Sequence, residues 1–157
     1  MKIFKMLSLA TLLLLTVVAC NNKNNGGSNE PSIGGWENLE QEWKLVSVNG
    51  VANDFSVYIE FMDGTFAMYQ QVYTWNYLFY DGEYSIDGDV ISGTYFEGGA
   101  WKTSYTGGVS TDGKTLTLKS KESTPVTYIY EACTIPQEVI DEAHGDLTRA
   151  ADVIPFL

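Results

Sequence analysis

Histidine, cysteine and positive charge are scarce in this chain of 157 residues. It has one histidine, His144, two cysteines, Cys20 and Cys133, and nine Lys and Arg against 20 Asp and Glu. A single histidine excludes metal sites built from several histidines and leaves at most one base for a nucleophilic triad. Nucleic acid and anionic membrane surfaces are unfavourable partners, because both repel an acidic protein.

Catalytic signatures are also absent from the sequence. It contains no Gly-x-Ser-x-Gly elbow and no Ser-x-x-Lys motif, so no serine stands out as a nucleophile. His144 falls near the end of a predicted helix, where the negative end of the helix dipole favours a solvated histidine. We therefore expect a protein that is not an enzyme and that needs neither a cofactor nor a metal.

No apolar run is long enough to span a bilayer, which takes about 20 residues. A shorter uncharged run, 6–19, follows Lys2 and Lys5 and ends in Val17-Val18-Ala19-Cys20. A positively charged start, a short apolar core and small residues before a cleavage point are the parts of an export signal. The alternative, a first buried helix, is unfavourable because a polar Asn-rich and Gly-rich stretch follows it.

The end of this run resembles a bacterial lipobox, in which a diacylglycerol is attached to the cysteine thiol and the peptide is cut before it. The resemblance implies removal of the signal peptide, 1–19, and lipidation of Cys20. It also implies an outer-membrane lipoprotein of the bacterial cell envelope, facing the periplasm or the cell surface. Val17 suits an ordinary signal peptidase as well, so cleavage without lipidation is the alternative. Residues 20–35 are predicted to be a flexible linker.

The remaining residues, 36–157, alternate apolar and polar side chains over short runs, as β-strands do. Roughly 120 residues are enough for one domain with one core. Asn-Gly and Asp-Gly dipeptides between several runs are typical of tight hairpin turns. The predicted strands are 42–48, 56–62, 65–73, 77–86, 90–95, 100–106, 115–119 and 126–133.

Eight antiparallel strands joined in sequence order close most simply into an up-and-down barrel, which leaves no exposed edge. A two-sheet β-sandwich is the alternative. Pro136 suits the first turn of a short C-terminal helix that runs to about Ala143. Cys133, without a partner if Cys20 is acylated, is expected to be a small buried residue in the last strand. Residues 153–157 are too apolar for a free tail, so we expect them to dock on the domain.

Four segments carry a family resemblance: Trp43-Lys44-Leu45-Val46-Ser47-Val48-Asn49-Gly50, Tyr58-Ile59-Glu60-Phe61 with Asp63-Gly64-Thr65-Phe66, Gly82-Glu83-Tyr84-Ser85-Ile86-Asp87-Gly88, and Asp112-Gly113-Lys114-Thr115-Leu116-Thr117-Leu118. In order and spacing they resemble the lipocalin-like domains of Bacteroidota lipoproteins, over residues 39–133. The resemblance implies a lipocalin-like barrel and, loosely, a binding function. Lipocalins proper carry Gly-x-Trp on the first strand; Trp43 matches, and Gln41 stands in the place of the glycine.

Aromatic residues are the one excess, with 4 Trp, 10 Tyr and 7 Phe. They either fill the barrel or line a site, where a ring supplies apolar contact and a hydroxyl or indole N–H orients a ligand. The candidate ligand-binding residues are Tyr73, Trp75 and Tyr77, at a predicted loop or strand end, and Trp101, which follows a glycine pair. We expect a membrane-tethered protein that binds a small, partly apolar ligand. The alternatives are a protein-interaction or inhibitor module with a filled barrel, or a carbohydrate-binding module.

Overall fold

The computed structural model describes residues 33–145 and 153–157. The predicted signal peptide, Cys20 and most of the predicted linker lie outside the described residues. Pro31–Leu157 forms one compact unit by itself. All strands and the helix described below belong to this unit.

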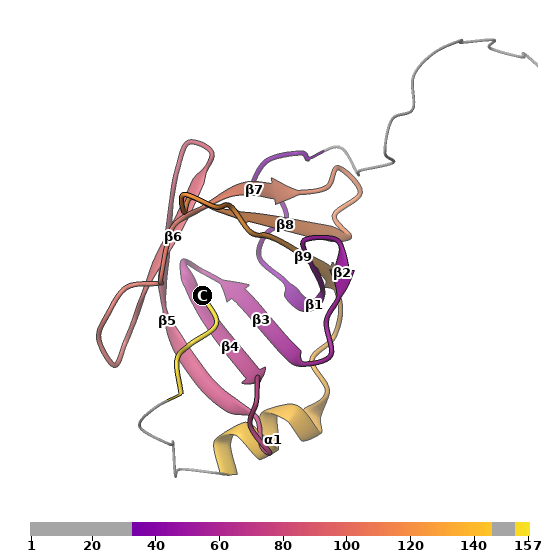
Figure 1. Cartoon of the computed structure of the whole chain (residues 1–157), viewed down its shortest axis with the longest axis vertical. Coiled ribbons are helices and arrows are strands. Elements are labelled where there is room, and N and C mark those ends of the chain that lie inside the picture. Colours follow the sequence, from indigo (N-terminus) through magenta and orange to yellow (C-terminus); the bar gives the residue numbers. More distant parts are fainter. Residues whose placement is uncertain (1–32, 146–152) are drawn as a thin grey trace, which may run out of the picture. The chain divides into compact units, whose positions relative to one another are not determined.

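Eight antiparallel strands of the unit are hydrogen-bonded in a ring (Figure 1). Each pairs with the next along the chain, and the first pairs with the last to close the ring. The predicted eight-stranded antiparallel barrel is thereby confirmed, and the β-sandwich alternative is wrong because the sheet is continuous. A two-residue strand, β2 (Val51–Ala52), also pairs with the first strand. The ring consists of β1 (Glu42–Val48), β3 (Ser56–Met62), β4 (Thr65–Gln71), β5 (Leu78–Asp87), β6 (Val90–Tyr95), β7 (Tyr105–Val109), β8 (Thr115–Ser120) and β9 (Thr127–Ala132).

Local sequence explains most of these elements. Asn49 and Asp63 adopt positive φ angles of 52° and 49° in the two tight turns that were predicted at these positions. In β3, Val57, Ile59 and Phe61 are buried in the ring while Tyr58 points to the outer face. A period of two thus separates the residues inside the ring from those outside it.

The predicted strand 100–106 is wrong in its position, because β7 is Tyr105–Val109. The chain from Trp101 to Ser104 is a connection in which the Trp101 indole turns into the core. Gly107 and Gly108 ended the predicted strand, yet both lie within β7. A Cβ on Gly107 would stand 2.0 Å from the Thr117 carbonyl oxygen. Glycine is therefore required at both positions because neighbouring backbone lies too close for a side chain, and the pair does not mark a turn.

Residues 33–35 lie against the far end of β7. Ile33 forms an isolated bridge with Ser110. The Gly34 N–H donates to the Val109 carbonyl at 2.7 Å, and the Val109 N–H donates to the Gly35 carbonyl at 2.5 Å. Backbone groups at this end of β7 are thus paired by a segment that precedes the first strand.

The C-terminal helix, α1 (Gln137–Gly145), packs on the outer face of β4 and β5. The Pro136 carbonyl accepts the first helical hydrogen bonds, so the predicted helix start is confirmed. Val139 and Ala143 are buried against Tyr69, in a second hydrophobic cluster. Cys133 is half-buried beside this cluster. It lies one residue beyond the end of β9, so its predicted position within the last strand is wrong. In the described ranges, no helix has the length and apolarity of a membrane span.

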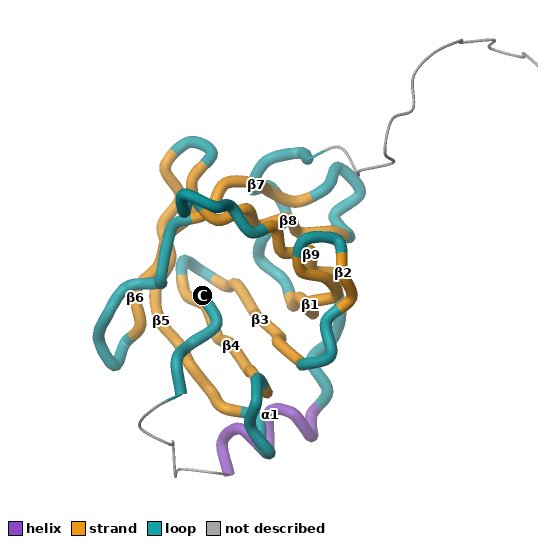
Figure 2. Tube along the Cα trace, in the orientation of Figure 1, coloured by secondary structure: helices purple, strands orange, loops and turns teal. Residues whose placement is uncertain are grey.

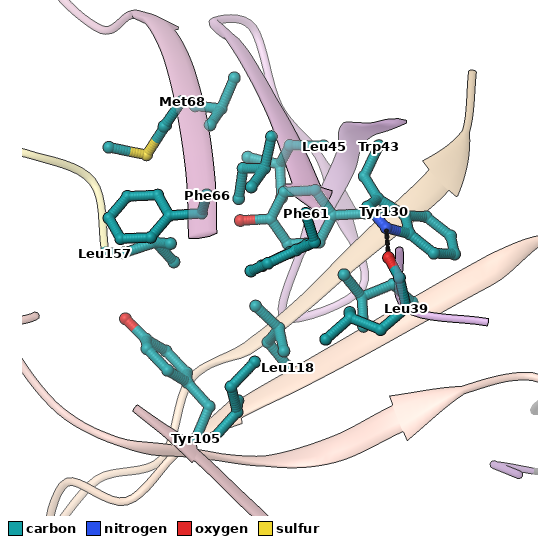
Figure 3. Packing of buried hydrophobic residues seen from close by; sticks show 14 of the residues in the cluster. Leu39, Trp43, Leu45, Phe61, Phe66, Met68, Tyr105, Leu118, Tyr130 and Leu157 are labelled. Atoms are coloured by element: carbon teal, nitrogen blue, oxygen red, sulfur yellow. Dashed lines mark hydrogen bonds between the residues drawn. The ribbon is translucent and has the colours of Figure 1, made fainter. Parts of the chain in front are cut away.

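The main hydrophobic cluster fills the ring. At one end, where tight turns join β3 to β4 and β5 to β6, the indole N–H of Trp43 donates to the Leu39 carbonyl at 2.9 Å (Figure 3). At the other end, the longer connections 72–77, 96–104 and 121–126 join the strands (Figure 2). We call this second end the tail end, because residues 153–157 reach it.

Candidate functional site

Residues 153–157, here called the tail, close the tail end of the ring. In Figure 1 they lie within the outline of the strands, close to β4 and β5. Leu157 is only 2% exposed and belongs to the main cluster, while Ile154 is 77% exposed. The expectation that these residues dock is confirmed. The tail therefore runs inward, from an exposed residue at the rim to a buried one in the ring.

A buried glutamine binds the tail backbone. Gln70, on β4, is 1% exposed. Its amide Nε2 donates to the Ile154 carbonyl at 3.1 Å, and its Oε1 accepts from the Phe156 N–H at 2.7 Å. Pro155, between them, has no N–H to satisfy. One side chain thus satisfies both backbone groups that flank the proline, as a neighbouring β-strand would.

Two tyrosines continue this recognition of the tail. The hydroxyl of Tyr80, on β5, donates to the Val153 carbonyl at 3.1 Å. The hydroxyl of Tyr95, on β6, donates to the Leu157 main-chain oxygen at 2.8 Å. Burial is the main cause that raises the pKa of Tyr95, so its hydroxyl keeps its proton, and can donate, at a higher pH than the hydroxyl of an exposed tyrosine. Three strands of the ring therefore contribute polar groups to one bound segment.

Aromatic rings surround the tail and extend into the ring. The Phe156 ring lies 5.7 Å from the Phe55 ring and 5.3 Å from the Tyr128 ring, measured between centroids. Tyr128 in turn lies 6.1 Å from Tyr105, and Tyr105 lies 6.0 Å from Trp101. All these pairs are tilted or edge-to-face, which are favourable aromatic arrangements. The Phe156 ring therefore lies between Phe55 and a series of rings that continues through Tyr128 and Tyr105 to Trp101.

The interior also holds polar groups that form no hydrogen bond with the side chains of the ring. The Tyr130 hydroxyl and the Trp101 indole nitrogen are buried and have no hydrogen-bond partner among the described residues. Burial raises the pKa of Tyr130 and of Tyr105. In Figure 3 the Tyr105 hydroxyl points toward the side of the cluster where Leu157 lies. An unpaired buried hydroxyl costs about 1–3 kcal/mol, so the unpaired Tyr130 and Trp101 groups are polar atoms of the core that lower the stability of the ring.

The four predicted ligand-binding residues occupy different surroundings. Tyr73, Trp75 and Tyr77 lie on the connection 72–77 and Trp101 lies on the connection 96–104, both at the tail end. Tyr73 and Trp75 are 97% and 96% exposed on the β4–β5 connection. Tyr77 packs in the cluster beneath α1, and Trp101 is 5% exposed in the main cluster. The structure brings Trp101 alone into the interior beside the aromatic rings described above.

Gly93 determines the position of Trp101. A Cβ at Gly93 would stand 2.3 Å from Cε2 of the indole. The indole therefore rests directly on the glycine backbone of β6, with its ring 5.1 Å from that of Phe66. A glycine at this position leaves the space that the large ring needs.

Gln70 was missed at the sequence level, although a signal for it existed. In β4, Phe66 and Met68 occupy alternate positions that point inward, and Gln70 is the next in that series. A polar residue in the core register of a strand needs a partner when buried. The sequence could not name that partner, because it lies more than 80 residues away.

Other features of the described residues are less suited to a function. An open depression of about 300 Å³ on β5 and β6 is lined largely by small and polar residues, among them Ser85, Ser92 and Thr94. In residues 33–145 and 153–157 no group of three or more His, Cys, Asp or Glu is placed to hold a metal. His144 is exposed and packs its ring 4.4 Å from that of Phe79.

Comparison with known proteins finds solved structures that are similar in backbone structure but low in sequence identity. No protein-family model and no curated protein match the chain. Among solved structures, the chain is similar to a lipocalin-like protein from Bacteroides uniformis, with a TM-score of 0.47 and 18% identity over 61% of this chain and 99% of that one. It is also similar to an uncharacterized protein from Bacteroides eggerthii, with a TM-score of 0.44 and 16% identity over 59% and 98% of the two chains.

Proposed function

We propose that this chain is a non-enzymatic binding protein that holds a small, partly apolar molecule inside the tail end of the ring. The observation that carries the proposal is Gln70, whose buried amide is turned to the tail and not to another strand. An apolar side chain at this position would suffice for a packed core, whereas an amide offers a donor and an acceptor to a polar segment. Buried amides and hydroxyls within an apolar enclosure are the usual composition of a small-molecule site.

The polar groups of the site are arranged over its depth. Gln70 and Tyr80 bind the tail near the rim, and Tyr95 binds Leu157 further in. The unpaired Tyr130 hydroxyl lies in the core. A ligand with hydrogen-bonding groups spaced along an apolar body would use these groups in place of the tail.

The test uses the compact unit Pro31–Leu157, which contains the whole ring and both clusters. The tail variant, Phe156→Ala with Leu157→Ala, keeps the chain length and removes the two side chains that hold the tail. We expect an apolar fluorescent probe such as anilinonaphthalene sulfonate to bind the folded tail variant at least tenfold more tightly than the wild type. Circular dichroism and cooperative unfolding verify that the variant is folded.

Native mass spectrometry of both proteins is the complementary measurement, because it detects a small molecule that copurifies. Adding Gln70→Leu to the tail variant should weaken the binding of probes that carry an amide or hydroxyl. The binding of purely apolar probes should not change. If the folded tail variant binds no apolar probe and copurifies with none, the interior is a packed core and the proposal fails.

The proposal includes a tether to the cell envelope through Cys20. It is supported by the lipobox-like segment that ends in Val17-Val18-Ala19-Cys20. In a bacterial host, the wild-type chain should incorporate radiolabelled palmitate and fractionate with membranes, while Cys20→Ser should do neither. Secretion of unlabelled wild-type protein would instead favour cleavage by an ordinary signal peptidase.

A second candidate function rests on the nearly complete exposure of Tyr73 and Trp75. Their loop is held in shape, since the Gln71 amide donates to the Trp75 carbonyl at 2.7 Å. Tyr73 has a φ of 59°, a conformation that is uncommon for a bulky residue. Two exposed rings on an ordered loop could stack on a sugar. Oligosaccharides should then change tryptophan fluorescence in the wild type and not in Trp75→Ala.

A further inference from the structure

The bound tail indicates the chemistry of the ligand. Gln70 contacts one backbone carbonyl and one backbone N–H, those of Ile154 and Phe156, at 3.1 and 2.7 Å. The hydroxyls of Tyr80 and Tyr95 each donate to a further main-chain oxygen. These hydrogen bonds depend on the peptide backbone of the segment and not on polar side chains.

Apolar contacts supply the remaining recognition. The Phe156 side chain packs against the rings of Phe55 and Tyr128. Leu157 enters the main cluster, where Figure 3 shows it beside Phe66 and below Met68. Alternation of backbone hydrogen bonds with apolar side-chain contacts is how extended peptides are bound at a sheet.

Pro155 favours an extended form of the segment. Its ring fixes its own φ, and it restricts Ile154 to extended conformations. A segment that is already extended loses less conformational entropy on binding. Ile154 itself points to solvent at 77% exposure, so its side chain is dispensable for docking.

We propose that the tail end is a peptide-binding site, which the chain's own residues 153–157 occupy and for which an extended apolar peptide of another chain competes. This inference rests on the proposed function and names the ligand class of the same site. A competing peptide must displace a segment attached to the same chain, whose effective concentration is in the millimolar range for a short connection.

The experiment measures binding of a fluorescently labelled synthetic peptide, Val-Ile-Pro-Phe-Leu, to the compact unit Pro31–Leu157. The peptide should bind the tail variant at least 100-fold more tightly than the wild type, in which the tail occupies the site. An ester analogue, in which oxygen replaces the Phe N–H, keeps the apolar surface and loses the donor to Gln70. We expect it to bind the tail variant about five- to tenfold more weakly than the amide peptide.

A second measurement does not depend on the tail variant. In isotopically labelled wild-type protein, unlabelled peptide at millimolar concentration should displace part of the tail and so shift the Phe156 amide resonance toward its random-coil position. A scrambled peptide, Pro-Leu-Ile-Val-Phe, should leave the resonance in place.

The inference is overturned if the folded tail variant does not bind the peptide, or if the ester binds as tightly as the amide. In the wild type, an unchanged Phe156 resonance at saturating peptide would also overturn it. Binding of apolar probes without binding of the peptide would refute the peptide inference and leave the proposed function standing. Absence of both would refute both.

Discussion

The side-chain Oε1 of Gln70 accepts a hydrogen bond of 2.7 Å from the N–H of Phe156, although 86 positions separate the two residues in the chain. Gln70 is almost fully buried and faces into the ring. The last residues of the chain are therefore part of the core and not an appendage. Stability of the ring and occupancy of its tail end should consequently change together.

Replacing Gln70 with leucine should lower the free energy of unfolding by about 1–3 kcal/mol, because the Ile154 carbonyl and the Phe156 N–H lose their partner. Urea denaturation provides the measurement. The matched control is Gln71→Leu, since the Gln71 amide donates to the Trp75 carbonyl in the β4–β5 connection and not to the tail. Proteolysis of the tail should accelerate in Gln70→Leu and stay unchanged in the control; equal effects would contradict the assignment.

Two tyrosine hydroxyls should differ in their contribution to stability. Tyr95→Phe should cost about 1 kcal/mol, because the hydroxyl donates to the Leu157 main-chain oxygen. Tyr130→Phe should be neutral or stabilising, because its hydroxyl is buried without a partner among the described residues. Thermal and chemical denaturation of both variants gives the comparison. A cost above about 1 kcal/mol for Tyr130→Phe would mean that this hydroxyl is satisfied in solution.

Gly93→Ala should destabilise the ring by about 1–3 kcal/mol through overpacking. The added methyl would stand 2.3 Å from the Trp101 indole, so the ring or the β6 backbone must shift. Thr94→Ala is the control, because Thr94 is exposed on the same strand. A shift of tryptophan emission to longer wavelength should accompany the loss in Gly93→Ala; an unchanged spectrum and stability would show that Trp101 does not rest on Gly93.

Stability should decrease at alkaline pH. Burial raises the pKa of Tyr95, Tyr105 and Tyr130 above the ordinary tyrosine pKa of about 10. The unfolded chain then loses these protons near pH 10 while the folded chain retains them, so the stabilisation is complete below that pH and is lost as the pH rises further. Denaturation between pH 8 and 11.5 measures the effect. Tyr105→Phe should show a shallower decline, and an identical decline would contradict the prediction.

Much of the ring could be predicted because its signals are local. Runs that alternate with a period of two, separated by turns such as Asp63-Gly64, defined β1, β3 and β6 at their observed bounds. The strand placed at 100–106 failed where local and tertiary signals disagree. Gly107 and Gly108 lie beyond the predicted end of that strand, and only the approach of the neighbouring backbone explains why β7 continues through them.

The candidate site was less predictable than the strands. Aromatic excess pointed to Trp101, which does lie in the interior, but the same argument also selected Tyr73 and Trp75, which are exposed at the rim. Whether an aromatic side chain in a connection is exposed depends on how that connection packs against the strands. The composition of the connection does not determine this packing. Gln70 required a partner that nothing in its own strand could reveal.

By itself, the sequence determined an antiparallel ring of strands, a helix that begins after Pro136 and a tail too apolar for solvent, because each follows from patterns within a few residues. The tertiary structure alone decided what the interior of the ring contains. The tail reaches from the rim to the buried Leu157 because Gln70, Tyr80 and Tyr95, from three different strands, bind one stretch of backbone. This arrangement arises only in the tertiary structure, which pairs β4, β5 and β6 side by side and brings the distant tail against them.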